Sequence, residues 1–112
     1  PDRHYGNFGV LFDTATMNVL QMAPVFDNNK SLLPELDNDQ LAAPDWYIAR
    51  CRPRIGRDFL LTARGLLTAE IRADLEQLRD FTFQQHSETP AEQVRLDALS
   101  SIVQDRIRQV LE

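Results

Sequence analysis

The sequence predicts an α+β fold that is mainly helical, with an N-terminal β-hairpin followed by about four helices. Two observations indicate this class. Two short apolar runs, residues 8–12 and 19–22, flank a polar linker, which is typical of a hairpin. Capping residues and apolar side chains at helical spacing then recur through residues 45–112. A chain of 112 residues forms at most one domain. We divide it into a site-bearing segment with the hairpin, residues 1–44, and a helical part.

The predicted hairpin brings two polar residues together at its open end. Its strands, Phe8–Phe12 and Val19–Met22, are joined by a polar linker at residues 13–18, which reverses the chain. Asn7 precedes the first strand and Asp27 follows the second. We therefore expect the side chains of Asn7 and Asp27 to lie close together.

The segment after the hairpin is expected to be irregular before the first helix begins. Residues 28–44 are rich in asparagine, acidic residues and proline and lack periodic apolar positions, which predicts a loop. Asp45 is then expected to cap a short helix that reaches Cys51 and ends before Pro53.

Three further helices follow in the prediction. One covers residues 58–65, and the next is capped by Thr68. The apolar residues of this next helix share one face: Ile71, Leu75 and Leu78. The last helix is expected to begin at Pro90, with Thr89 as its cap and Glu92 completing a capping box. It carries a sustained apolar stripe: Leu96, Leu99, Val103, Ile107 and Val110.

Three side chains near the hairpin have the chemistry that phosphoryl transfer requires: Asp2, Asn7 and Asp27. In kinases, one Asp accepts the proton of the attacking hydroxyl, while an Asn and a second Asp hold magnesium ions against the nucleotide phosphates. Asp2 and Asn7 have the five-residue offset of a kinase catalytic loop. We therefore expect Asp2 to be catalytic and Asn7 and Asp27 to bind the metal. The alternative is that Asp2 and Asn7 cap a turn and residues 27–29 form a polar loop.

The run D-R-H-Y-G-N, followed by M-A-P-V-F-D-N, resembles the catalytic loop and metal-binding segment of HipA-like kinases. These are bacterial Ser/Thr kinases, distantly similar to the phosphatidylinositol 3-/4-kinases. The resemblance covers about the first quarter of the chain and implies a kinase that uses ATP and Mg²⁺. It implies Asp2 as the catalytic Asp, with Asn7 and Asp27 as magnesium ligands that position the nucleotide. It also implies that His4 lies near the transferred phosphate.

The resemblance further implies partner proteins. The sequence departs from the pattern of ordinary protein kinases at one point. Family members phosphorylate Ser/Thr hydroxyls of proteins and work beside small DNA-binding regulators, in a toxin-antitoxin-like arrangement. Asn28 and Asn29 follow Asp27 where ordinary protein kinases have Phe-Gly, which leaves open how Asp27 is held. Two alternatives remain open. One is a helical interaction module with a degenerate kinase loop, and the other is a lipid kinase, which the net acidity disfavours.

Further charged residues are candidates for ligand contact. Lys30 and Ser31 follow the metal-binding segment and could contact substrate or phosphate, although a solvated loop is the favoured interpretation. A basic cluster could meet phosphate or an acidic partner, or pair with the acidic loop before it, and we favour the pairing. The cluster consists of Arg50, Arg52, Arg54 and Arg57.

Composition excludes several classes of protein. The net charge of −5 argues against direct binding of nucleic acid. The single cysteine, Cys51, excludes an internal disulfide and indicates a reducing compartment. No apolar stretch in the sequence reaches membrane-spanning length, and no leader-like segment is present. We therefore expect a cytoplasmic protein that does not bind membranes.

Some parts of a kinase are not found in this sequence. A kinase needs an N-terminal lobe with a loop that covers the nucleotide and a phosphate-binding Lys. The four glycines form no phosphate cradle, and the single lysine, Lys30, follows the metal-binding segment. The chain opens at Pro1, directly on the catalytic loop, so we expect a C-terminal portion that works with a missing N-terminal lobe. Alone it is expected to bind ATP poorly and to transfer no phosphate.

Overall fold

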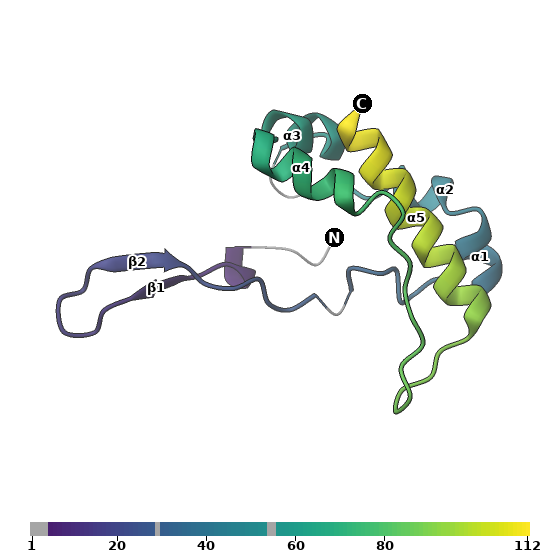
Figure 1. Ribbon diagram of the computed structural model, residues 1–112, viewed down its shortest axis with the longest axis horizontal. Helices are drawn as coiled ribbons and strands as arrows, with labels where there is room; N and C mark the ends of the chain where they lie inside the picture. The colour runs from purple at the N-terminus through teal and green to yellow at the C-terminus, as the bar shows by residue number, and fades with distance from the viewer. Residues whose placement is uncertain (1–4, 29, 54–55) are drawn as a thin grey trace. The chain divides into compact units, whose positions relative to one another are not determined.

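The computed structural model of the protein describes residues 5–28, 30–53 and 56–112. Within these ranges it has a two-stranded antiparallel hairpin followed by five helices (Figure 1), which confirms the predicted mainly helical α+β class. The chain forms two units, Pro1–Pro34 and Glu35–Glu112. The hairpin belongs to the first unit, and the five helices belong to the second.

The hairpin forms where the sequence predicts it. Three elements make up the described part of the first unit: the 3₁₀ helix η1 (Tyr5–Asn7), β1 (Val10–Phe12) and β2 (Val19–Met22). Val10 lies opposite Met22, and a bulge interrupts the register between Leu11 and Phe12. All six apolar side chains of the two strands are at least 42% exposed.

The side chain of Asp13 organises the turn between the strands. Its Oδ1 accepts hydrogen bonds from the backbone N–H groups of Ala15 (2.8 Å) and Thr16 (2.9 Å). The bond from the Thr16 backbone, and then that from Ala15, lower the pKa of the Asp13 carboxyl, because both bonds favour its charged form. The Asp13 N–H donates to the carbonyl of Asn18 at 2.9 Å, which closes the loop. The polar linker therefore reverses the chain through local bonds.

The helical unit begins with a helix that the sequence did not predict. Its five helices are α1 (Asn38–Ala42), α2 (Asp45–Ile48), α3 (Phe59–Gly65), α4 (Ala69–Gln77) and α5 (Gln93–Leu111). The prediction of a loop over residues 28–44 is wrong at α1. There the Asp37 carboxylate accepts the N–H of Gln40 at 2.8 Å, and the Gln40 side chain accepts the N–H of Asp37 at 3.0 Å. This complete capping box stabilises one short helix inside an otherwise polar segment.

α2 is shorter than predicted and begins differently. Asp45 is the first helical residue instead of the cap, and Pro44 occupies the N-cap position without a side-chain cap bond. Pro44 has φ −83° and ψ −5°, a backbone conformation already close to helical, so the helix begins directly after it. Beyond Ile48, the N–H of Cys51 is shared between the carbonyls of Tyr47 at 3.2 Å and Ile48 at 3.0 Å, so a turn follows the helix up to Cys51.

The predicted cap of α4, Thr68, is confirmed, and α3, predicted over residues 58–65, begins at Phe59 with Asp58 as its cap. The Asp58 carboxylate accepts the N–H of Leu61 at 2.8 Å, and the Thr68 hydroxyl accepts the N–H of Ile71 at 3.1 Å. The predicted apolar face of α4 is only partly covered, because Ile71 and Leu78 are each 45% exposed.

α5 begins later than predicted. Glu92 is its N-cap residue and forms no side-chain cap bond, so the predicted capping box of Thr89 and Glu92 is wrong, and the helix begins at Gln93. The side chain of Gln85 explains the delay. Its Oε1 accepts the N–H of Ala91 at 3.1 Å, and its Nε2 donates to the Ala91 carbonyl at 2.6 Å. Ala91 is therefore held in a loop, which prevents the helix from starting there.

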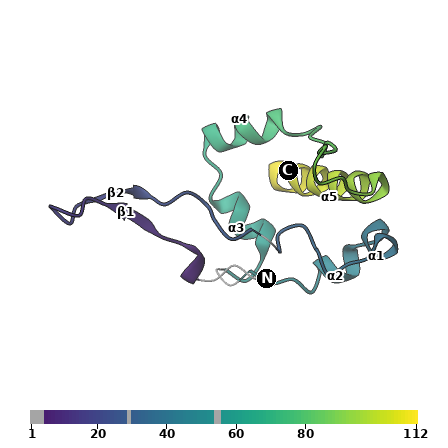
Figure 2. The same ribbon diagram turned by 90° about the horizontal axis from the view of Figure 1, so that it is seen from below.

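α5 is the helix against which the unit packs. Among the described elements, α1 packs near its beginning and α3 and α4 near its end (Figures 1 and 2). The buried apolar side chains are Leu36, Leu41, Leu99, Ile107, Val110 and Leu111. Three of these belong to the predicted stripe of α5, which is therefore confirmed as the face that is turned to the core.

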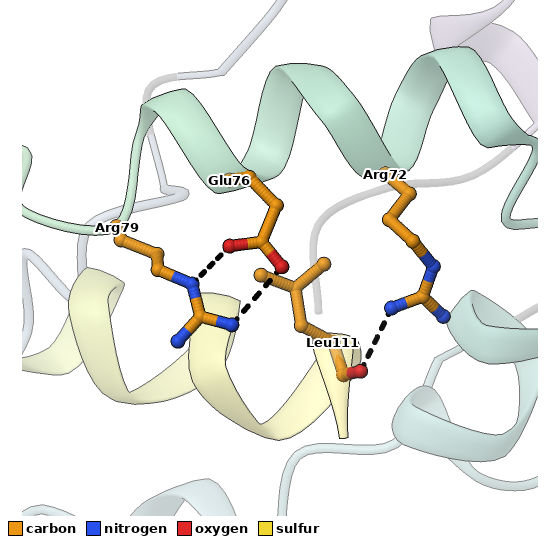
Figure 3. A network of polar contacts seen from close by, with 4 residues as sticks. All are labelled: Arg72, Glu76, Arg79 and Leu111. Carbon is orange, nitrogen blue, oxygen red and sulfur yellow. Dashed lines mark hydrogen bonds and ion pairs between the residues drawn. The ribbon is translucent and has the colours of Figure 1, made fainter.

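Arginine side chains fasten α3 and α4 to the last turn of α5. Arg72 on α4 donates from Nη1 to the carbonyl of Leu111 at 2.9 Å (Figure 3). Arg64 on α3 donates from Nε to the carbonyl of Gln109 at 3.1 Å. Carbonyl groups in the last turn of a helix lack helical donors, so both arginines satisfy groups that the helix leaves open. The pair of Arg79 and Glu76 in Figure 3 is exposed, and pairs of this kind add little stability.

The hydrogen bond from Tyr47 to Glu35 leads to a prediction on pH. The phenol donates to the carboxylate, and this bond is the main reason that the pKa of Tyr47 is raised to about 12. A raised pKa means that folding favours the protonated phenol. The stabilisation is therefore complete below the ordinary tyrosine pKa of about 10 and is lost as the pH rises through about 12. An absorbance titration of tyrosinate checks this.

The two tyrosines of the chain give this titration an internal control. In the Tyr47→Phe variant only Tyr5 titrates, so the difference between the two curves isolates Tyr47. A difference curve centred at the ordinary tyrosine pKa would contradict the hydrogen bond.

Candidate functional site

The structure brings Asn7 and Asp27 together at the open end of the hairpin. Asn7 is the last residue of η1 and is only 4% exposed. Beyond the strands, the N–H of Ala23 donates to the carbonyl of Gly9 at 2.9 Å, which keeps the two chain segments adjacent past the last strand pair. The chain that leaves β2 therefore passes next to η1, as the sequence predicts.

The two side chains are in direct contact. Asn7 Nδ2 donates to Asp27 Oδ2 at 3.4 Å, a long hydrogen bond between residues twenty positions apart. Asp27 has φ +57°, in the left-handed region that Asp tolerates better than most residues. This conformation turns the chain at Asp27, immediately after the extended segment from β2.

The spacing of the two groups fits a magnesium site. Two ligands that bind one Mg²⁺ at right angles lie roughly 3 Å apart, because each is about 2.1 Å from the ion. The contact of 3.4 Å between the amide and the carboxylate is near this value. A half-turn of the Asn7 amide exchanges its nitrogen and oxygen, so Oδ1 can take the place of Nδ2. Asn7 and Asp27 together can therefore offer two hard oxygen ligands to one cation.

A pair of ligands is a normal protein contribution for magnesium. Among the described residues, no group of three or more His, Cys, Asp or Glu side chains could hold a metal. Mg²⁺ is commonly bound by one or two protein groups together with water and substrate phosphates. The pair therefore has the chemistry of a partial cation site, in which other ligands complete the coordination of the ion.

Other residues predicted for the site have different outcomes. Asp2 and His4 lie outside the described residues, so their predicted roles stay predictions. Lys30 and Ser31 are exposed, and the N–H of Ser31 donates to the Asn28 carbonyl at 3.0 Å in a turn. This is the solvated loop that we favour from the sequence.

The favoured pairing of the basic cluster with the acidic loop is not found among the described residues. Arg50, Arg52 and Arg57 form no ion pair there, and Arg54 lies outside these residues. The guanidinium of Arg50 instead lies 5.9 Å from the ring centre of Trp46 on α2.

No protein-family model matches the chain, and no curated protein or solved structure matches it either. The motif and the contact between Asn7 and Asp27 are therefore the features of this chain that bear on its function.

Proposed function

We propose that this chain carries the catalytic loop and metal-binding segment of a HipA-like Ser/Thr kinase, which transfers the γ-phosphate of ATP to a protein hydroxyl. The observation that carries the proposal is the contact between Asn7 and Asp27. The resemblance assigns these two residues to one metal, and their side chains are in contact although a hairpin separates them in the sequence.

Each residue of the motif has a separate task in this proposal. Asn7 and Asp27 hold Mg²⁺, which when bound offsets the negative charge of the nucleotide phosphates. Asp2 accepts the proton of the Ser or Thr hydroxyl and orients its oxygen for attack. His4 donates a hydrogen bond to the transferred phosphate. Asn7 is 4% exposed and its side chain already contacts Asp27, so only a turn of the amide is needed to present Oδ1 to the metal.

The proposed setting is the cytoplasm, where ATP and protein substrates are available. None of the described helices combines the length and the apolar composition that a bilayer span requires. The single cysteine fits a reducing compartment.

Binding of a paramagnetic metal tests the proposed site in this chain directly. Mn²⁺ takes oxygen ligands like Mg²⁺ and broadens NMR signals of nearby nuclei. We expect Mn²⁺ to broaden the signals of Asn7 and Asp27 first, and Mg²⁺ to reverse the effect by competition. Asp27→Asn is expected to abolish the selective broadening.

Asp13→Asn is the matched control for this experiment. It removes the same charge from the same unit, and Asn preserves the side-chain turn that Asp13 forms. Equal broadening in the Asp27→Asn and Asp13→Asn variants would show that Mn²⁺ binds the hairpin only through general negative charge, and would contradict the site.

A second function is favoured by the exposed apolar side chains of the hairpin. A two-stranded hairpin is marginally stable on its own, and apolar side chains are exposed on both strands. The chain would then be a degenerate kinase-like module without catalytic activity. It would dock through this hairpin, for example onto a small DNA-binding regulator, and the docking would cover the exposed apolar side chains. In that case the Mn²⁺ titration is silent and the hairpin signals change on adding the partner.

A further inference from the structure

The helical unit contains a cavity that the kinase assignment does not use. It has a volume of about 320 Å³ and is lined by described residues within 44–53 and 57–60 and by one face of α5. This volume is at the lower end of the range of about 300–1,000 Å³ that is typical of small-molecule sites. All of its lining residues that the structure describes belong to the helical unit, so the cavity is independent of Asn7 and Asp27.

Positive charge exceeds available negative charge in this cavity. Three arginines line it: Arg52, Arg57 and Arg106. Three aspartates also line it. Asp105 pairs at 2.8 Å with Arg108, which does not line the cavity, whereas Asp58 keeps its charge while it accepts the backbone N–H of Leu61 at 2.8 Å. Among the described lining residues, Asp45 and Asp58 therefore face three guanidinium groups.

The arginines differ in how they are held. Arg106 donates to the side chain of Gln109 at 3.0 Å, and its guanidinium lies 5.6 Å from the ring centre of Phe59. Among the described residues, neither Arg52 nor Arg57 forms an ion pair. Arg52 and Arg57 can therefore bind an anion without breaking an existing ion pair there.

The cavity also has an apolar part. Ile48 of α2, Phe59 of α3 and Ile102 of α5 line it together with the arginines. A ligand that fits both parts has one anionic end and one flat or apolar end. Guanidinium groups bind phosphate through paired N–H donors, which makes phosphate the anion best matched to arginine.

We propose that this cavity binds a small phosphate monoester with an aromatic or apolar group. Arg52 and Arg57 bind the phosphate, and the apolar group contacts Phe59, Ile48 and Ile102. Arg106, fixed by Gln109 and Phe59, contributes positive charge at the border between the two parts. The small volume favours a free molecule over an extended surface of a macromolecule.

Phenyl phosphate is a suitable probe, with inorganic phosphate and phenol as its two halves. In an NMR titration of the chain, we expect phenyl phosphate to shift the signals of Phe59 and Ile102 and to bind at least about tenfold more tightly than either half. Arg52→Gln and Arg57→Gln, made singly, are each expected to weaken binding of phenyl phosphate about tenfold. Higher salt should weaken binding as well, because the contact is ionic.

Arg79→Gln provides the matched control. It removes the same charge from the same unit, at an exposed position that does not line the cavity. Melting curves of all variants establish that they are folded. The proposal is overturned if phenyl phosphate shifts no cavity signal, if Arg52→Gln and Arg57→Gln bind as well as Arg79→Gln, or if inorganic phosphate binds as tightly as phenyl phosphate.

Discussion

Asp27→Asn is expected to reduce phosphate transfer by at least about 100-fold, measured in the complete polypeptide as the cell makes it. The substitution keeps the size of the side chain and its ability to bond to Asn7, and it removes only the negative charge. Under the proposed function, that charge holds the metal against the nucleotide phosphates. The assay follows radiolabelled phosphate from ATP into a mixed library of peptides that contain Ser or Thr.

Asp2→Asn tests the acceptance of the hydroxyl proton separately from the binding of the metal. It is expected to lower transfer as strongly, because the proton acceptor is lost, while Mn²⁺ still broadens the signals of Asn7 and Asp27. Asp13→Asn should transfer phosphate at the original rate. Full activity in the Asp27→Asn protein would contradict the kinase assignment, whatever metal the chain binds.

Leu41→Ala is expected to destabilise the helical unit by about 2–5 kcal/mol, the usual cost of removing a large buried side chain. Leu41 is the most deeply buried large side chain among the described residues, at 1% exposure. It lies on α1, which packs on α5, so its loss opens the contact between them. Small domains have a total stability of about 5–15 kcal/mol, so this change is a large part of it.

Chemical denaturation followed by circular dichroism measures the effect on Leu41→Ala. Leu61→Ala is the control, since Leu61 lies on α3 and is 74% exposed, and it should change the free energy of unfolding by less than about 0.5 kcal/mol. A similar small change for Leu41→Ala would mean that α1 does not contribute to the core.

The elements that the sequence predicts correctly are those that depend on local chemistry. The hairpin follows from two apolar runs and the Asp13 turn, and α3 and α4 follow from the caps Asp58 and Thr68. α1 carries an equally local signal, the capping box of Asp37 and Gln40, but it is short and surrounded by turn-forming residues. Its helix therefore depends on the burial of Leu41, which is a tertiary effect.

The beginning of α5 shows the opposite case, in which a capping-box pattern is overridden by a side-chain contact within the preceding loop. Thr89 and Glu92 have the spacing of a capping box. The side chain of Gln85 instead binds both backbone groups of Ala91, so the helix begins at Gln93. Such a bond between loop residues has no periodic pattern that a sequence can reveal.

Of the two candidate sites, one could be predicted from the sequence and the other could not. The closeness of Asn7 and Asp27 could be predicted, because they flank the two strands of a hairpin, whose open end brings the flanking residues together. The arginine-lined cavity could not be predicted, because it forms only when the segment around Arg52 and Arg57 packs against α5. The clustering of arginines was the one signal in the sequence, and Phe59, Ile102 and Arg106 gave none.

The position of α5 has a consequence for synthesis on the ribosome. Among the described helices, α1, α3 and α4 contact α5, which follows all of them in the chain. As translation proceeds, Leu36 and Leu41 leave the exit tunnel long before α5, on which α1 packs, has been made. Apolar side chains of the nascent helical unit therefore stay exposed until α5 emerges. Chaperones that bind exposed leucines would act in that interval.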